Sequence, residues 1–155
     1  MNKIYITADE LLSSSLKLGQ MVVKDGFRPD FIVGVWRGGT PVGSAVQELL
    51  DFCHIKTDHF AIRTSSYRGI AKQEAKVSVY GLHYLIDNMN YDDSLLIVDD
   101  VFDSGRSVQA IIGELDIHMR NTTPTDIRGG TVYYNPTQNL PDRTPNYYSH
   151  QREDW

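Results

Sequence analysis

Short continuous apolar runs along this chain predict buried β-strands. The two clearest are 31–36 (FIVGVW) and 95–98 (LLIV), each too short for a typical helix and each followed by polar or glycine-rich residues. We expect the first of these to be a central strand of a sheet. Weaker alternation of apolar and polar residues predicts further strands at 54–64, 77–82 and 127–134.

Segments with helical spacing of apolar residues separate these runs. The first begins at Thr7 and Glu10, which fit a capping box, and it ends before Gly26. Two further helices are predicted at 42–50 and at about 104–118. Strands that alternate with helices predict an α/β fold with a mainly parallel sheet flanked by helices on both faces.

Three polar segments have no clear periodicity. Residues 65–75, which include Gly69, predict a mobile loop or a loose hairpin, and residues 86–93 predict a polar turn. The segment 135–155 is rich in Pro, Asn and Asp. The length of 155 residues favours a single domain over 1–155.

Composition and charge narrow the function classes. The formal net charge of −5 argues against nucleic acid as a partner, because domains that bind nucleic acid are usually basic. The single Cys53 excludes an internal disulfide and fits a reducing compartment. No apolar run approaches the roughly 20 residues that span a bilayer, and the first residues lack the apolar stretch of a secretory signal. We therefore expect a cytoplasmic protein without membrane contact.

The strongest chemical signal lies at the end of the 95–98 run. Asp99 and Asp100 follow it directly, and after two apolar residues the loop 103–107 (DSGRS) opens the next helix. Ligands of open α/β sheets bind at the carboxyl ends of strands, and a Ser/Gly loop at a helix N-terminus binds anions. Acids beside an anion site point to a phosphorylated sugar.

A second glycine loop follows the other clear strand. Arg37, Gly38 and Gly39 come after the 31–36 run and before a predicted helix. If the two strands are neighbours in a parallel sheet, both loops lie close together on its carboxyl edge. One ligand with two phosphate-type groups would then bridge them.

Two phosphate-binding motifs are excluded, and one alternative stays open. The chain contains neither a P-loop nor a dinucleotide-binding glycine pattern. Two acids after a strand also fit the metal-holding strand of a phosphatase, which would use Asp99 and Asp103. The five histidines show no metal-ligand spacing, so none is assigned to a metal: His54, His59, His83, His118 and His150.

The order of residues over 95–107 closely resembles the phosphoribosyl-pyrophosphate signature of type I phosphoribosyltransferases. The segment WRGG at 36–39 resembles the pyrophosphate loop of that family, and SSYRG at 65–69 resembles its flexible catalytic loop. The end of the chain, PNYYSHQREDW, resembles the C-terminal hood of the purine branch, which acts on xanthine or hypoxanthine and guanine. The resemblance thus implies a type I phosphoribosyltransferase fold with 135–155 as a small hood.

The resemblance implies a reaction as well as a fold. 5-Phosphoribose would pass from phosphoribosyl pyrophosphate to a purine-like nucleobase with Mg²⁺ and release of pyrophosphate, as in purine salvage. Asp99 and Asp100 would hold the ribose hydroxyls, directly or through Mg²⁺, and stabilise positive charge on the sugar. Asp103 would act as the general base toward the purine.

The matching loops would bind the phosphates. Ser104, Gly105, Arg106 and Ser107, with their backbone amides, would surround the 5′-phosphate, and Gly105 would allow a close backbone approach. In the other loop, Arg37 with the amides of Gly38 and Gly39 would bind pyrophosphate and neutralise the leaving group. Residues 66–68, with Ser66 and Tyr67 touching the substrate, would close over the site and exclude water.

Two positions bear on the base. Trp155 would stack on the purine face. Asn135 stands where purine phosphoribosyltransferases usually carry a Lys that bonds the 6-oxo group, and an Asn amide can either donate to a carbonyl or accept from an amine. Because Asn135 departs from the usual Lys, the resemblance does not determine which base is used. The same departure favours a second hypothesis, a non-catalytic regulatory protein of the same fold that binds phosphoribosyl pyrophosphate or a nucleotide. By family analogy we also expect a homo-oligomer.

Overall fold

The fold is built on one six-stranded sheet. In this computed structural model, the structure describes residues 4–68, 75–137 and 144–153. The strands lie in the order β3-β2-β1-β4-β5-β6. Their bounds are β1 Phe31–Trp36, β2 Asp58–Arg68, β3 Ala75–Tyr80, β4 Ser94–Phe102, β5 Asp126–Tyr134 and β6 Tyr147–Gln151. Only β3 runs antiparallel to its neighbour among these strands, so the predicted mainly parallel sheet is confirmed.

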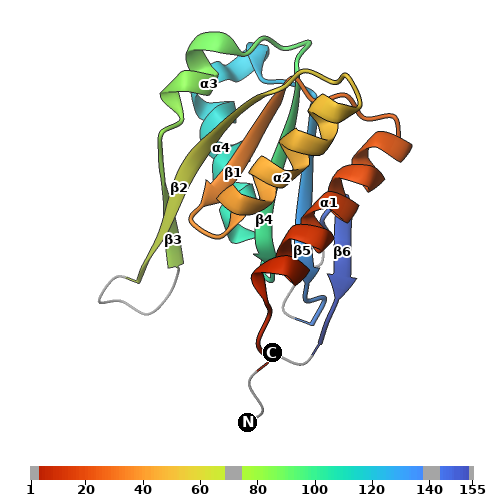
Figure 1. Cartoon of the computed structure of the whole chain (residues 1–155). Helices are drawn as coiled ribbons and strands as arrows, with labels where there is room; N and C mark the ends of the chain where they lie inside the picture. Colours follow the sequence, from red (N-terminus) through yellow and green to blue (C-terminus); the bar gives the residue numbers. More distant parts are fainter. Residues whose placement is uncertain (1–3, 69–74, 138–143, 154–155) are drawn as a thin grey trace.

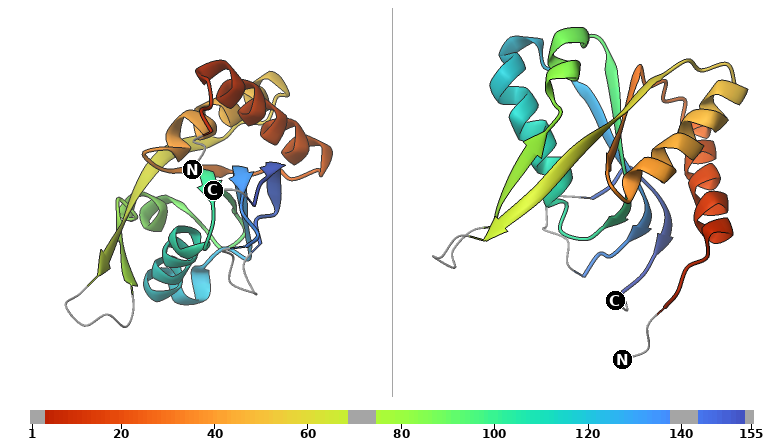
Figure 2. Two further views of the ribbon diagram at one scale, coloured as in Figure 1. Left: turned by 90° about the horizontal axis from the view of Figure 1, so that it is seen from below. Right: turned by 60° about the vertical axis from the view of Figure 1, so that its left-hand side comes forward.

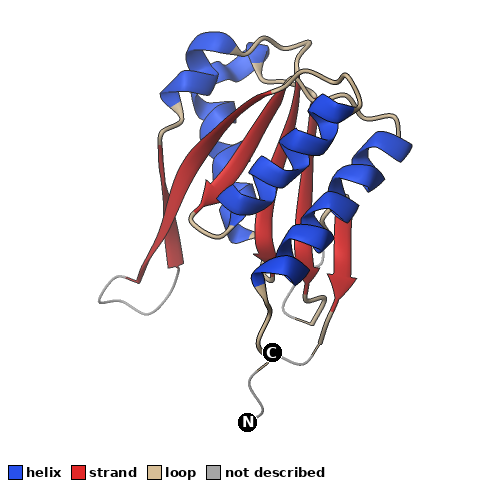
Figure 3. Ribbon diagram, in the orientation of Figure 1, coloured by secondary structure: helices blue, strands red, loops and turns tan. Residues whose placement is uncertain are grey.

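Helices cover both faces of the sheet, as the sequence predicts. They are α1 Ala8–Lys24, α2 Gly39–Phe52, α3 His83–Asn88 and α4 Arg106–Met119, with a short 3₁₀ turn at Arg120–Thr122. The α1 and α2 helices pack on one face, and α3 and α4 pack on the other (Figures 1 and 3). No helix within the described parts of the chain combines the length and the apolarity that crossing a membrane requires.

The apolar runs are continuous because both central strands are buried on both faces. Ile32 and Leu96 pack with α1 and α2, whereas Val33 and Ile97 pack with α3 and α4. All four side chains are completely buried. Successive residues of a strand point to opposite faces, so a strand that is covered twice needs apolar residues at every position.

The start and the end of α1 follow the signals in the sequence. The Thr7 hydroxyl accepts a hydrogen bond from the Glu10 amide at 3.1 Å, and the Glu10 carboxylate accepts one from the Thr7 amide at 2.9 Å. The chain leaves the helix at Asp25, and Gly26 follows with a φ of +78°. The predicted capping box is therefore confirmed.

Two elements were not predicted. Helix α3 (83–88) overlaps the segment expected to be a polar turn, so that expectation is wrong for 86–88. The helix is only six residues long, and Leu85 is its one buried residue, so no apolar period marks it. Strand β6 lies within 135–155 and pairs with β5, Thr131 opposite Tyr148, although its sequence gave no clear alternation. Because 138–143 and 154–155 lie outside the described residues, the hood over this segment stays a prediction.

The carboxyl ends of β1, β4, β5 and β6 lie along one edge of the sheet (Figure 2, left, seen from below). Strands β1 and β4 are adjacent at the centre, with Gly34 opposite Val98 in the pairing register. Continued by two residues, this register brings Trp36, the last residue of β1, level with Asp100, so the first loop leaves the sheet beside the acidic pair. The neighbour relation on which the sequence argument depends is thus confirmed.

We expect the central strands to dominate the stability of the fold. Leu96→Ala should lower the free energy of unfolding by about 2–5 kcal/mol, because it removes a completely buried side chain and leaves a cavity. The matched control is Leu12→Ala, because Leu12 is 53% exposed and its loss should cost less than about 0.5 kcal/mol. Urea unfolding followed by circular dichroism measures both, and equal losses would contradict the packing described above.

Candidate functional site

The glycine loop after β1 lies directly on the end of β4. A Cβ atom at Gly38 would come within 2.3 Å of the nearest carboxylate oxygen of Asp100, and one at Gly39 within 2.5 Å of the carbonyl oxygen of Val98. Both distances are shorter than any contact that a real side chain makes. Glycine is therefore required at Gly39, where the backbone of β4 leaves no room for a side chain, whereas at Gly38 a side chain would displace the Asp100 carboxylate.

The same loop starts helix α2. The Arg37 carbonyl oxygen accepts hydrogen bonds from the Thr40 amide at 3.2 Å and from the Thr40 hydroxyl at 2.6 Å, which closes the first turn. The Trp36–Arg37 peptide bond is cis. The Arg37 side chain is exposed at the edge of the sheet. The first amides of a helix have no acceptor within the helix, so this turn presents donors beside a cation.

Asp99 and Asp100 form a coupled acidic pair at the end of β4. Asp99 accepts a hydrogen bond from the Asp100 amide, and Asp100 accepts one from the Val101 amide, both at 2.9 Å. Burial, with a hydrogen bond to Asp100 and repulsion from its charge, raises the pKa of Asp99 to about 8. At neutral pH the pair therefore retains a proton that a bound cation would displace.

The second loop turns sharply into helix α4. Gly105 has a φ of +70° at the cap of the helix, and its carbonyl oxygen accepts a hydrogen bond from the Gln109 amide at 3.0 Å. No side chain caps the helix start, so its first amides stay available to an anion, with Arg106 exposed beside them. The Thr64 hydroxyl of β2 donates to the Ser107 hydroxyl at 3.2 Å, which ties this loop to the neighbouring strand.

Asp103 stands exposed at the start of this loop. Its carboxylate accepts a short hydrogen bond from the Ser104 amide. That amide is therefore occupied by its own loop, and the amides from Gly105 onward are the ones left for a phosphate. The carboxylate keeps a second oxygen for another partner.

Asn135 lies beside the second loop, where β5 ends. Its backbone amide donates to the carbonyl oxygen of Phe102, the residue before Asp103, at 3.0 Å. Its side-chain oxygen accepts from the Thr137 amide at 3.0 Å and from the Thr137 hydroxyl at 2.6 Å. The backbone amide of Thr137 can only donate, so the side-chain atom of Asn135 that faces it is the oxygen and not the nitrogen. The completely buried side-chain nitrogen is a donor that has no partner among the residues that the structure describes.

The predicted flexible segment is a hairpin as far as the structure describes it. Ser66 and Tyr67 belong to β2, and their backbones pair with Val77 and Lys76 of β3. The hairpin extends past the body of the sheet at the edge where the loops lie (Figure 1). Residues 69–74 and Trp155 lie outside the described residues, so closure of this loop and stacking by Trp155 stay predictions.

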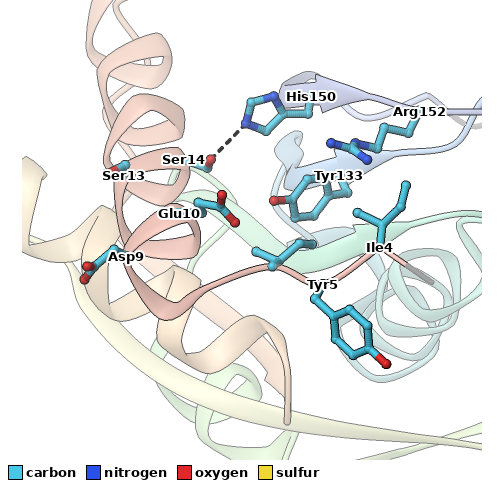
Figure 4. Close-up of a pocket in the computed structure, with 10 residues that line it drawn as sticks. Ile4, Tyr5, Asp9, Glu10, Ser13, Ser14, Tyr133, His150 and Arg152 are labelled. Atoms are coloured by element: carbon cyan, nitrogen blue, oxygen red, sulfur yellow. Dashed lines mark hydrogen bonds between the residues drawn. The ribbon is translucent and has the colours of Figure 1, made fainter. Parts of the chain in front are cut away.

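A hollow of about 620 Å³ opens beside α1 and the ends of β5 and β6 (Figure 4). Its wall contains Tyr133, stacked at 5.4 Å on His150, which in turn shares a 2.8 Å hydrogen bond with Ser14 of α1. Neither Arg37 nor any residue of 99–107 lines it. These contacts fasten β6 to α1, and the hollow is separate from the two loops.

Two of the residues at the site were not found from the sequence. Thr137 fixes the orientation of Asn135, and the signal was available, because an Asn before a Pro is typical of a turn with side-chain bonds to the backbone. Thr64 contacts the second loop from a distant strand, and no local pattern marks such a contact. No group of three or more His, Cys, Asp and Glu side chains gathers to hold a metal within the described ranges.

The raised pKa of Asp99 gives a stability prediction. The folded protein retains a proton that the unfolded chain loses between about pH 4 and pH 8, so stability falls as the pH rises through this window. Asp99→Asn should therefore stabilise the protein at pH 8, by on the order of a few kcal/mol, and by much less at pH 4. Thermal melts across this range measure the effect, with the exposed Asp92→Asn as control. A variant that follows the wild type at every pH would contradict the coupling of the acidic pair.

Comparisons with known proteins agree with this arrangement. A purine phosphoribosyltransferase from Pyrococcus horikoshii is 23% identical, with a TM-score of 0.75 over 100% of this chain and 91% of that one. A hypothetical protein from Neisseria gonorrhoeae with bound ppGpp is 18% identical, with a TM-score of 0.76 over 99% and 85%. A hypoxanthine phosphoribosyltransferase from Staphylococcus aureus is 17% identical, with a TM-score of 0.70 over 99% and 79%.

These structures share the fold at low sequence identity. No curated protein sequence matches the chain. The family model of the phosphoribosyl transferase domain matches residues 6–155, which is nearly the whole chain. The chain therefore belongs to the phosphoribosyltransferase family, as the two loops and the acidic pair between them indicate.

Proposed function

We propose that this protein transfers 5-phosphoribose from phosphoribosyl pyrophosphate to a 6-oxopurine base, with Mg²⁺, and releases pyrophosphate. The observation that carries the proposal is the contact between the Arg37 loop and the acidic pair, which is followed along the chain by the 103–107 loop. Gly38 lies against the Asp100 carboxylate, so the Arg37 loop and the 103–107 loop flank one acidic pair. A ligand that carries pyrophosphate on one side of a sugar and a phosphate on the other matches this order of groups.

The residues suit the departure of pyrophosphate. The bond between C1′ and the pyrophosphate oxygen breaks, and its electron pair leaves with pyrophosphate, which Arg37 and the helix amides stabilise. The ribose then carries positive charge, which Asp99 and Asp100 stabilise. A base nitrogen supplies the electron pair of the new C1′–N bond. The hairpin of β2 and β3 lies where it can exclude water from the activated sugar.

The acidic pair also fits a magnesium ion. Carboxylate oxygens are the ligands that Mg²⁺ prefers, and the proton on this pair at neutral pH marks a place where a cation is favoured. Asp99 and Asp100 would hold the ion together with water and substrate oxygens, because Mg²⁺ needs six ligands. When bound, Mg²⁺ would supply positive charge to the leaving pyrophosphate.

The proton lost by the base goes to Asp103. This carboxylate is exposed and bonded only to its own loop, so its second oxygen is free to accept. It lies one residue after Phe102, whose carbonyl oxygen accepts a hydrogen bond from the backbone amide of Asn135. The proposed proton acceptor, Asp103, and the residue proposed to contact the purine, Asn135, are therefore neighbours at the ends of β4 and β5.

A second candidate function is regulatory binding of a nucleotide without turnover. The neighbour from Neisseria gonorrhoeae, which has the same fold, contains bound ppGpp. Under either function the same loops would hold the phosphates. The proposal also includes a role in purine salvage and self-association of the chain, which follow from the family resemblance. The proposed cytoplasmic location follows from the single cysteine and the absence of a long apolar run in the sequence.

The role of Asp103 separates the two functions. In Asp103→Asn, we expect kcat for nucleotide formation to fall by about 10²-fold or more, while binding of phosphoribosyl pyrophosphate is retained, because the amide cannot take the proton. Nucleotide is followed by chromatography with Mg²⁺ and a panel of bases, and binding by calorimetry. The exposed Asp116→Asn on α4 is the control and should behave as the wild type.

Each outcome of this assay has a distinct meaning. Binding by the wild type without nucleotide formation from any base would refute catalysis and support the regulatory function. Release of inorganic phosphate without a base would support the phosphatase alternative. No binding of phosphoribosyl pyrophosphate would refute the proposal altogether.

The orientation of Asn135 predicts the preferred base. Its oxygen is occupied by Thr137, so a base that reaches this buried side chain meets the nitrogen, and a donor fits a 6-oxo group better than a 6-amino group. We expect hypoxanthine or guanine to be preferred over adenine, and Asn135→Asp to reduce kcat/KM for the oxopurine by about 5- to 100-fold. Asn121→Asp, at an exposed position, is the control. A preference for adenine would contradict the orientation described here.

A further inference from the structure

A histidine lies near the start of helix α2, and no motif in the sequence includes it. The imidazole of His59, in β2, fills a space between β1 and α2 that two glycines leave open. A Cβ atom at Gly34 would be 3.0 Å from His59 Nε2, and one at Gly43 would be 2.5 Å from the same atom. Each glycine therefore makes room for the ring, one from the strand and one from the helix.

The space that Gly34 leaves open also borders the backbone of the loop. The Cβ position at Gly34 lies 3.2 Å from the Gly39 carbonyl oxygen and 3.2 Å from the Thr40 Cα, as well as 3.0 Å from the ring. Gly39 and Thr40 form the first turn of α2, which presents amides beside Arg37. The ring and this turn therefore border the same small space, and the ring also lies against Gly43, which follows on the same helix.

The ring is held by packing rather than by hydrogen bonds at its inner end. His59 Nε2 is buried and has no hydrogen-bond partner within the described part of the chain. Burial lowers the pKa of His59, and the neighbouring Asp58 opposes this effect only in part. The positions that face the ring from β1 and α2, Gly34 and Gly43, carry no charge. At neutral pH the side chain is therefore an uncharged spacer.

We propose that His59 is a positioning residue that sets the height of the Arg37–Thr40 turn over the end of β4, and so its affinity for pyrophosphate groups. This inference rests on the proposed function. An ordinary core residue at this place would support only the stability of the fold. A spacer beneath the turn would in addition change the binding of the diphosphate end of the substrate and leave the binding of the base unchanged.

The two sides of the contact allow a double-mutant cycle. His59→Ala removes the spacer, and Gly43→Ala pushes a methyl group against it. Each single variant should raise the KM for phosphoribosyl pyrophosphate about tenfold and keep the KM of the base and kcat within about twofold. The double variant should be closer to the wild type than the product of the two effects, because the new methyl group fills space that the ring has left.

Two further variants serve as references. His59→Gln keeps much of the length and the neutral polarity of the side chain, and it should restore most of the affinity that His59→Ala loses. Gly113→Ala is the matched control for Gly43→Ala, because a Cβ at Gly113, also within a helix, would have no atom within 4 Å. Thermal melts check that every variant is folded at the assay temperature.

Calorimetric titration with phosphoribosyl pyrophosphate and Mg²⁺ accompanies the kinetics and separates the possible failures. If the wild type binds and both single variants bind equally well, the inference is wrong and the proposed function stands. Lower melting temperatures with unchanged affinity, or independent effects in the double variant, would also overturn it, since the residue would then be only part of the core. If the wild type itself does not bind, the proposed function fails and this inference fails with it.

Discussion

The close approach of a glycine backbone to the end of β4 is the constraint on which the site depends. Gly39 lies against the carbonyl oxygen of Val98, and Gly38 lies against the Asp100 carboxylate. A side chain at Gly39 would separate the first loop from the end of β4, and one at Gly38 would displace the Asp100 carboxylate. The pair would then stand beside one anion site only, and one ligand could not be held from both sides.

The fold provides this approach at a cost in stability. Two adjacent parallel strands that are buried on both faces bring their carboxyl ends to the same edge of the sheet, and their loops turn to opposite faces, one into α2 and one into α4. The carboxylates at this point are partly buried and repel each other, which raises the pKa of Asp99 to about 8. A cation that binds to the two carboxylates would remove this repulsion between them.

Much of the fold could be predicted because its signals are local. Continuous apolar runs marked both central strands, and Thr7 with Glu10 marked the start of α1. The acids and glycines of the two loops were also found from their order along the chain, since the chemistry of phosphate binding restricts the residue types. The short α3 was missed because six residues do not establish a period, and β6 because its pairing with β5 is decided by tertiary contacts.

The parts of the site that could not be predicted depend on contacts between distant segments. The orientation of the Asn135 amide follows from Thr137, and the sequence allowed either orientation until the bond from the Thr137 backbone was known. His59 became visible only when Gly34 and Gly43 were placed around it. Both cases show that the residue type can be read from the sequence, whereas its role depends on which neighbour occupies the adjacent space.

The central claim is that both loops bind the same ligand at the same time. Backbone amide resonances of 37–39 and 105–107, followed by NMR while phosphoribosyl pyrophosphate is added with Mg²⁺, test it most directly. The account predicts that both groups of amides shift along one common binding curve. Shifts confined to one loop, or two curves with different midpoints, would contradict it.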